Sequence, residues 1–536
     1  MGKKQTAATS QKLPGIRKNH DFLSYLDSVL EKHETWLSWS IVSAFFLVMS
    51  FLTLRYHTTG GFGVETDFYA ELAYQAQLLL RGDFSPMNYG AKGPVYSLIL
   101  AGVSLVVRDL FVSGLLINLI SGFTFLIVLF YLVKQIFNRI TAFVVILAVA
   151  FNFSFQSYIY QAGSDLPFMA LSILSIFFLY RSEKRKYLVL SAVFGLFAFL
   201  TRYNGAFIAF GSMLYLAFSG GTAKERLKRI GLWTAVYICL GLPWFIPNYI
   251  VRGNPVYNSN YINVMIDFYG IGKEGFSVET WYDRLPDKFN SLGDVILYDP
   301  VHFITHLSAN IITHFLLDIQ KLIGLGLGIF TVLGIPMLFI VKPSRKMLLY
   351  FSFGIFYFLI LTLVFYNARF SLFLITLYLP LAVWPFTEKK VSKYLRKFSG
   401  VPVILIFTMT LYSGYTSSKV TVYDIKNVNP LLEELKIIGE NLDKIEVDKS
   451  QKILARKPNT AHYAGLTPIM FPEDVDTVEK LIDYCNEIKA RYILYSATEY
   501  EIRPKMRILY DKNYEHPGLE RVFYNRAGFV YRVRGI

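Results

Sequence analysis

Residues 60–96 read GGFGVETDFYAELAYQAQLLLRGDFSPMNYGAKGPVY and directly follow the first apolar run of the chain. The stretch is polar enough for a membrane surface, and its charged residues include Glu65, Asp67, Glu71 and Lys92. We expect Thr66 to cap a helix over about 67–81 that stops at Gly82. Asp67 would then lie in the first turn, where the helix dipole favours an ionised carboxylate. The stretch therefore predicts an anionic base. The alternative is that these acids are ordinary residues of a helix start.

The composition predicts a membrane protein with a separate C-terminal domain. Hydrophobic residues make up 54% of the chain and aromatic residues 17%, far above a typical soluble protein. Apolar runs of spanning length recur over 37–418 and are absent from the remainder. Residues 421–536 contain 18 basic and 18 acidic residues, so the net charge of +15 comes from the membrane part and no nucleic-acid partner is needed to explain it. We predict an N-terminal cytoplasmic segment (1–36), a membrane domain (37–419) and a soluble domain (420–536).

Common metal, nucleotide and redox motifs are missing from the sequence. It contains no Walker lysine loop, HExxH or CxxC. Cys239 and Cys485 offer neither a disulfide framework nor a metal-ligand spacing. Three histidines, His302, His306 and His314, fall near helical spacing but lack a nearby acid ligand in the sequence. We therefore predict neither a metal nor a cofactor.

Basic residues set the expected sidedness. The N-terminal segment carries a basic group of residues and no cleavable signal pattern, so it should stay in the cytoplasm while 37–56 leads the chain outward as a retained anchor. The basic residues are Lys3, Lys4, Lys12, Arg17 and Lys18. Five positive loops should also be cytoplasmic: 134–139, 181–186, 224–229, 342–346 and 389–397.

One apolar run must not cross the membrane if these loops share a side. The run 93–107 has only 15 residues, short of the roughly 20 that a spanning helix needs, so we expect a juxtamembrane helix on the outer face. The loop 251–321 is left outside, and its amphipathic part 302–321 should lie on the membrane. Eleven crossings then place the soluble domain outside: 37–56, 111–133, 140–160, 165–180, 187–200, 204–219, 229–250, 322–341, 347–366, 369–386 and 400–418.

The soluble domain has the pattern of a small α/β fold. Its alternating and apolar stretches predict a helix over 476–489 and four strands, at 452–455, 492–496, 522–524 and 529–533.

Five charged residues fall at one level of the outer face under this topology: Asp67, Lys92, Asp165, Arg202 and Arg369. Charges at membrane level are functional candidates by default, although interfacial anchoring is the alternative for each of them alone. Their shared sidedness favours an anionic lipid phosphate held by Lys92, Arg202 and Arg369. A carboxylate would be left to act as a base.

The order of these motifs resembles the superfamily C glycosyltransferases, in particular the aminoarabinose lipid A transferase and protein O-mannosyltransferase group. The first outer loop matches through Asp67, Tyr69-Ala70-Glu71, Gly82-Asp83 and Lys92-Gly93-Pro94-Val95-Tyr96. Farther on, Ser164-Asp165-Leu166-Pro167 resembles the second acidic motif of the group, Leu200-Thr201-Arg202 its LTK or LTR turn, and Asn367-Ala368-Arg369-Phe370 its late arginine motif. The likeness covers residues 40–390.

The sequence departs from this group in two places. Gly93-Pro94 stands where the group has two prolines, and the first acid can be aligned at Glu65 as well as at Asp67. The base could therefore be either residue. No WWD-type motif is present, which disfavours transfer of a large preassembled glycan to asparagine.

The resemblance implies an enzyme of the inner cell membrane with its active site outside the cytoplasm. It would transfer one sugar, a hexose or pentose, with inversion from a polyprenyl-phosphate-linked donor to a lipid, glycan or protein acceptor. The expected catalytic residues are Asp67, Glu65 and Asp165, and the expected phosphate ligands are Lys92, Arg202 and Arg369. A transporter or flippase of lipid-linked sugars is the alternative, because it would also need cations for phosphate.

Overall fold

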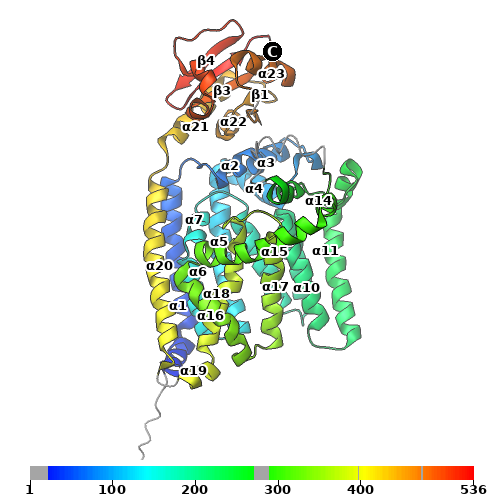
Figure 1. The fold of residues 1–536 in the computed structure, drawn as a ribbon, viewed down its shortest axis with the longest axis vertical. Helices are drawn as coiled ribbons and strands as arrows, with labels where there is room; N and C mark the ends of the chain where they lie inside the picture. The colour runs from blue at the N-terminus through cyan, green and yellow to red at the C-terminus, as the bar shows by residue number, and fades with distance from the viewer. Residues whose placement is uncertain (1–21, 271–288, 396–397, 473–474, 536) are drawn as a thin grey trace, which may run out of the picture.

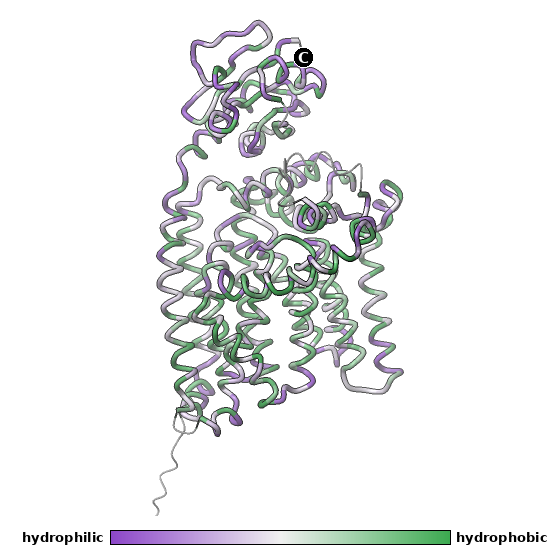
Figure 2. The backbone as a smooth tube through the Cα atoms, in the orientation of Figure 1, coloured by the Kyte–Doolittle hydropathy of each residue, from purple (hydrophilic) through white to green (hydrophobic). Residues whose placement is uncertain are grey.

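The computed structural model describes residues 22–270, 289–395, 398–472 and 475–535. The basic residues between 3 and 18, part of the predicted outer loop 251–321 and the end of the positive loop 389–397 lie outside the described residues. A bundle of long helices stands beneath a small sheet domain at the C-terminal end (Figure 1). Apolar residues predominate along the bundle helices, and polar residues gather in the loops and in the C-terminal domain (Figure 2).

Each of the eleven predicted crossing segments contains a helix. The bundle helices are α1 (Phe22–Tyr56), α5 (Leu110–Ile136), α6 (Arg139–Ala150), α7 (Phe153–Ile159), α8 (Asp165–Leu179), α9 (Arg185–Thr201), α10 (Ala206–Phe218), α11 (Ala223–Arg252), α16 (Leu325–Val341), α17 (Arg345–Leu361), α18 (Ile375–Thr387) and α20 (Val401–Lys426). Among the described residues, four helical stretches are long and apolar enough to cross a membrane: Phe22–Tyr56, Leu110–Ile136, Ala223–Arg252 and Phe370–Thr387. A fifth is added if α6 and α7, bent by 60°, form one span. The other predicted crossings are shorter or less apolar, so the number eleven stays a prediction.

The described parts of the five positive loops lie at one end of the bundle, opposite the C-terminal domain (Figure 1). Lys134 pairs with Glu34 near the start of α1, and Gln135 donates to the Tyr180 carbonyl at 3.2 Å. The remaining loops are joined in the same way: the Tyr180 hydroxyl donates to the Lys346 carbonyl at 2.7 Å, Lys390 Nζ donates to the Val341 carbonyl at 3.0 Å, and the Arg345 guanidinium lies 5.7 Å from the Phe218 ring. The predicted common side of these loops therefore agrees with their placement in the fold.

The two segments predicted to lie on the membrane are both helices. α4 (Val95–Val107) has 13 residues and packs against α3, α5 and α9. At 1.5 Å per residue it is about 20 Å long, short of a hydrocarbon core of about 30 Å. α15 (Pro300–Leu317) runs across the long helices beneath the first outer loop and follows α14 (Leu292–Tyr298) (Figure 1).

The helix of the first outer loop begins earlier than predicted. It consists of α2 (Val64–Asp67), a π-helical turn (Phe68–Leu72) and α3 (Ala73–Leu80). The prediction that Thr66 caps this helix is wrong: the N-cap is Gly63, which takes a φ of 94° that glycine tolerates, and the Thr66 hydroxyl accepts from the Gly63 amide at 3.2 Å. Asp67 still lies in the first turn. Gly82, with a φ of 86°, follows the end of the helix as expected.

The C-terminal domain contains a five-stranded mixed sheet in the order β2-β1-β3-β5-β4. β1 is parallel to β2 and β3, whereas β5 is antiparallel to β3 and β4. The strands are β1 (Lys452–Leu454), β2 (Thr467–Ile469), β3 (Tyr492–Ser496), β4 (Leu519–Asn525) and β5 (Gly528–Val533), with helices α21 (Pro430–Ile445), α22 (Asn459–Ala464), α23 (Val478–Ile488) and α24 (Ala497–Ile502). The four predicted strands and the predicted helix are present. The missed strand β2 is a three-residue edge strand containing Pro468, a residue type confined to edges.

This domain touches the first outer loop through α22. Asn459 Nδ2 donates to the Gly60 carbonyl at 3.2 Å, the hydroxyls of Tyr463 and Tyr69 are 3.0 Å apart, and the rings of His462 and Tyr69 lie 4.9 Å apart. Burial lowers the pKa of His462 to about 4, with Lys436 also lowering it and Asp109 opposing. The imidazole is therefore neutral at pH 7, and Tyr69 stands two residues from Asp67.

Candidate active site

A cluster of charged side chains forms around the buried Arg369, whose exposed fraction is 9%. Its Nε donates to Asp165 Oδ2 at 2.9 Å, and its Nη1 donates to Asp67 Oδ2 at 2.7 Å. Arg202 pairs with the other oxygen of Asp165. Buried charges persist only when they are paired, so these contacts hold together four stretches that lie up to 302 residues apart in the chain.

Helix ends place the three partners of this cluster. Asp165 is the first residue of α8, where the helix dipole favours a carboxylate. Arg202 follows the last residue of α9 in an extended conformation (φ −148°, ψ 128°), which turns it out of the helix. Arg369 is held by the side chain of Asn367, whose Oδ1 accepts from the Arg369 amide at 2.9 Å. Helix ends thus supply these three charges, and the fourth, Asp67, is the last residue of α2.

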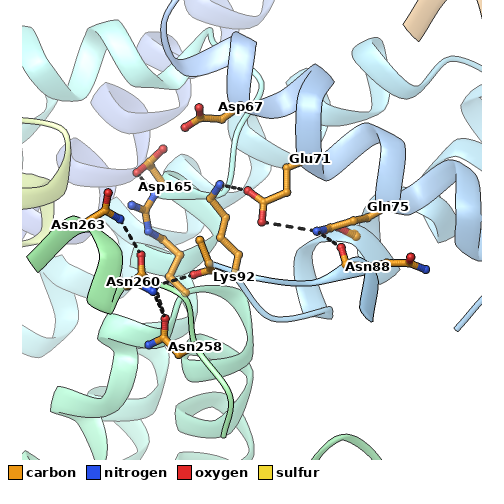
Figure 3. Close-up of polar contacts among 12 residues, drawn as sticks. Asp67, Glu71, Gln75, Asn88, Lys92, Asp165, Asn258, Asn260 and Asn263 are labelled. Atoms are coloured by element: carbon orange, nitrogen blue, oxygen red, sulfur yellow. Dashed lines mark hydrogen bonds and ion pairs between the residues drawn. The ribbon is translucent and has the colours of Figure 1, made fainter. Parts of the chain in front are cut away.

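Lys92 enters the same region from the first outer loop and pairs with Glu71 (Figure 3). Gln75 lies behind this pair: its Nε2 donates to the Asn88 carbonyl at 3.0 Å, and its Oε1 accepts from Ser97 Oγ at 2.8 Å. The sequence singled out Glu71 as one of the loop acids but did not assign it to the site. An acid one helical turn after Asp67 was the available signal.

Gly93 explains the departure from the double-proline pattern. A Cβ at this position would overlap the backbone carbonyl of Leu200, so a side chain cannot be accommodated without moving the backbone. The close approach packs the start of α4 against the end of α9. It thereby brings Lys92 next to the turn that carries Arg202.

The two alternative bases lie in opposite environments. Glu65 is 1% exposed and accepts from the Ala162 amide at 2.8 Å and the Gly61 amide at 2.5 Å, besides contacting His57 Nε2 at 2.9 Å. The Asp67 side chain is 45% exposed. Among the described residues its Oδ2 is bound by Arg369 alone, and its Oδ1 has no hydrogen-bonding partner.

An asparagine ladder from the loop after α11 joins the backbone just before Lys92 (Figure 3). Asn260 Nδ2 donates to the Ala91 carbonyl at 2.8 Å and to Asn258 Oδ1 at 2.6 Å. Asn263 Nδ2 in turn donates to Asn260 Oδ1 at 3.3 Å. Sequence reasoning missed these residues, although the repeated asparagines of NSNYIN were a visible signal of side-chain hydrogen bonding.

The histidine-rich helix α15 has an acid neighbour that the sequence spacing did not reveal. His306 Nε2 lies 3.3 Å from Asp267 Oδ2, and the same oxygen accepts from Asn310 Nδ2 at 2.8 Å. His302 Nε2 instead contacts the Phe268 carbonyl at 2.8 Å. The premise that no acid is near these histidines is therefore wrong. Within the described part of the chain, no group of three or more His, Cys, Asp or Glu residues is placed to hold a metal.

Comparison with known proteins supports the resemblance drawn from the motifs. Residues 91–250 match the family described as dolichyl-phosphate-mannose-protein mannosyltransferase. This segment includes Lys92, Asp165 and Arg202. No curated protein sequence matches the chain.

Solved structures share the fold at low sequence identity. The archaeal oligosaccharyltransferase AglB from Archaeoglobus fulgidus, in complex with an inhibitory peptide and a dolichol-phosphate, matches with a TM-score of 0.56 and 12% identity over 87% of this chain and 70% of that chain. ArnT from Cupriavidus metallidurans bound to undecaprenyl phosphate matches with a TM-score of 0.54 and 11% identity over 94% of this chain and 98% of that chain. The chain is therefore similar to these multi-pass membrane proteins over nearly its full length, and the predicted resemblance to superfamily C glycosyltransferases is confirmed.

Proposed function

We propose that this membrane protein of the superfamily C fold transfers a single sugar from a polyprenyl-phosphate-linked donor to an acceptor outside the cytoplasm. The observation that carries the proposal is the pairing of a half-exposed carboxylate with a buried arginine. Arg369 Nη2 is buried and has no hydrogen-bonding partner among the described residues, while Asp67 beside it keeps one free oxygen. An unpaired donor next to an available base fits a phosphate leaving group beside an acceptor hydroxyl.

The charges of the cluster fit the chemistry of this transfer. A phosphate departs as an anion, so the leaving side needs cations rather than a general acid. Lys92, Arg202 and Arg369 would hold this phosphate, Arg369 through its unpaired nitrogen. Asp67 would take the proton of the acceptor as the acceptor oxygen attacks the anomeric carbon. A single displacement of this kind inverts the anomeric centre.

We assign different roles to the other two candidate acids. Asp165 is occupied on both oxygens by arginines, so it orients Arg202 and Arg369. Glu65 is saturated by backbone amides and His57 and cannot reach an acceptor without leaving them. This division favours Asp67 over Glu65 as the base.

The topology completes the proposal. We propose eleven crossings in the inner cell membrane, with the positive loops in the cytoplasm and both the charge cluster and the C-terminal domain outside. The positive-inside bias supports this direction, because the five loops lie together at the end opposite the cluster. A transporter site would be expected nearer the middle of the membrane, which favours an enzyme over a flippase.

The topology is tested by single-cysteine labelling on a background lacking Cys239 and Cys485. Glu183 and Lys393 are exposed positions in two of the positive loops, and Asp83 is an exposed position of the first outer loop. We expect a membrane-impermeant reagent applied from outside to label a cysteine at position 83 only. Labelling at positions 183 and 393 would instead show that the topology is inverted. The proposed active site would then not lie on the outer face.

The function is tested by mass spectrometry of outer lipids, glycans and glycoproteins from cells with and without the gene. We expect an acceptor to lose the mass of one sugar in the deleted strain, while a polyprenyl-phosphate sugar accumulates. Purified protein should then transfer this sugar from the same donor in detergent, where no membrane has two sides. Restoration only in sealed vesicles would instead identify a flippase.

A further inference from the structure

The C-terminal domain contains a groove far from the charge cluster in sequence and built entirely from that domain. Its cavity volume is about 930 Å³, near the upper end of the range of about 300–1,000 Å³ that ligand pockets occupy. The groove is lined by the segment 500–512 and by the turn between β4 and β5. Residues of the proposed transfer site do not contribute to it.

A row of aromatic rings lines this groove. Tyr500 and Tyr510 have ring centroids 5.2 Å apart, Tyr510 and Phe529 are 5.0 Å apart, and Phe529 and Tyr524 stack at 5.2 Å with planes 12° apart. Phe529 is buried as the floor, whereas Tyr500 is 37% exposed and Tyr524 is 50% exposed. Arg507 lies 4.7 Å from the Tyr500 ring centroid and Arg521 lies 5.3 Å from that of Tyr524. The exposed parts of these rings therefore combine apolar surface, polar hydroxyl ends and neighbouring cations, which suits ligands that are partly apolar, hydroxylated and anionic.

Hydrogen bonds fix the position of this aromatic row. The Tyr510 hydroxyl donates to the Arg526 carbonyl at 2.6 Å, which ties the segment 500–512 to the β4–β5 turn. Arg507 Nε donates to the Tyr500 carbonyl at 2.8 Å, and its guanidinium lies 4.7 Å from the Tyr500 ring centroid. Rigid aromatic side chains lose little conformational entropy on binding, so a preformed row of rings is suited to recognition.

Positive charge gathers at the groove although the domain as a whole is balanced. Arg507, Lys512 and Arg526 line it together with one acid, Asp511. Arg526 is paired with Glu434 at 2.7 Å, but neither Arg507 nor Lys512 has a carboxylate partner among the described residues. Because residues 421–536 contain equal numbers of basic and acidic residues, this local excess is not a general property of the domain. The charge is complementary to an anionic ligand.

We propose that this groove binds an acidic oligosaccharide, a glycan that carries carboxylate or phosphate groups. Sugar rings would contact the exposed parts of Tyr500 and Tyr524, and the anionic groups would meet Arg507 and Lys512. The site is a binding site without chemistry of its own. It goes beyond the proposed sugar transfer and does not depend on it.

The test uses the full-length protein in detergent and three labelled probes: a galacturonic acid hexamer, a phosphorylated mannose oligomer and neutral maltohexaose. We expect at least one acidic probe to bind ten-fold or more tightly than maltohexaose. Tyr524→Ala and Lys512→Ala should each weaken binding of that probe five-fold or more, and Tyr524→Phe should restore it. Binding of neither acidic probe overturns the proposal.

Matched controls separate the groove from general charge and from unfolding. Met470→Ala and Lys444→Ala remove an exposed apolar residue and an exposed cation elsewhere on the same domain and should leave binding unchanged. Because Tyr524 and Lys512 are exposed, their variants should melt at the wild-type temperature. Displacement of the bound probe by polyglutamate of equal charge would identify an acidic protein segment as the ligand. It would overturn the proposal that the groove binds a glycan.

Discussion

Glu65 and Asp67 stand two residues apart in one helical turn, yet they belong to two regions with opposite properties. Around Glu65, backbone amides from the first outer loop and from residue 162 fill both carboxylate oxygens. Around Asp67, one arginine fills one oxygen and the other faces open space. A fully satisfied buried carboxylate stabilises a loop, whereas a half-satisfied exposed one can exchange a proton. The comparison shows how neighbouring acids divide structural and chemical roles.

The largest expected effect comes from Asp67→Asn, which removes the base but keeps the shape. Loss of a general base costs about 10²–10⁴-fold in rate, so we expect transfer by the purified variant to fall by at least 100-fold. Donor binding and the melting temperature should stay near those of the wild type. Asp83→Asn, at an exposed acid of the same loop, is the matched control. Near wild-type turnover of Asp67→Asn would reverse the comparison and make Glu65 the base to test.

Substitution of the three proposed phosphate ligands should show the next largest effect. In Lys92→Ala, Arg202→Ala and Arg369→Ala we expect weaker donor binding, because a hydrogen bond to a charged group contributes about 1.5–3 kcal/mol. Isothermal titration with the polyprenyl-phosphate donor measures this loss. Arg108→Ala, at an exposed cation that directly follows α4, should bind donor like the wild type. Unchanged affinity in all three variants would place the phosphate elsewhere.

Glu65→Gln tests whether the Glu65 carboxylate stabilises the first outer loop. The amide of glutamine cannot accept from all the donors that Glu65 now satisfies, so we expect a loss of stability of about 2 kcal/mol. Thermal unfolding in detergent measures it, with Glu440→Gln on the exposed face of α21 as the control. Transfer per folded molecule should change much less than in Asp67→Asn. A variant that is fully stable but inactive would contradict the division of roles.

The smallest effect is expected at the contact between α22 and the first outer loop. The pKa of His462 is lowered to about 4 by burial, so below about pH 6.5 the undocked histidine binds a proton that the docked one does not. Docking should therefore weaken as the pH falls from about 6.5 to 4. A disulfide between Cys variants at Gly61 and Asn459 should form more slowly across that window, beyond the slowing that protonation of the thiols causes in any cysteine pair. In His462→Gln this extra slowing should disappear and only the thiol contribution should remain. The same profile with and without His462 would show that His462 does not carry the effect.

The sequence allowed a good prediction of which residues converge but not of how they pair. Helix periodicity and the positive loops predicted the bundle segments. The resulting topology predicted that Asp67, Lys92, Asp165, Arg202 and Arg369 lie at one level of the outer face. Pairing depends on helix starts and side-chain reach, which are not encoded in local pattern. For that reason the cap at Gly63, the Lys92 partner Glu71 and the asparagine ladder all emerged only in three dimensions.

The same limit applies to the C-terminal domain. β1 and β2 each have three residues, but only β1 was predicted, because β2 contains Pro468, which weakens the strand pattern. The aromatic row of the groove joins residues from three separate segments, so no local pattern marks it.

The stretch Phe370–Thr387, which ends in α18, carries a consequence for how the protein is made. Of its apolar window, 94% is buried inside the protein, and it begins beside the charged Arg369 and contains Pro380 and Pro385. In the folded protein this segment is therefore surrounded by other helices, although it is apolar enough to cross a membrane. The two helices that it contacts most, α6 and α16, precede it in the chain, whereas α19 (Lys389–Leu395) and α20, which it also contacts, follow it. Because α6 and α16 are synthesised before α18, α18 can pack against them as soon as it is made. The order of synthesis would then be part of the folding mechanism.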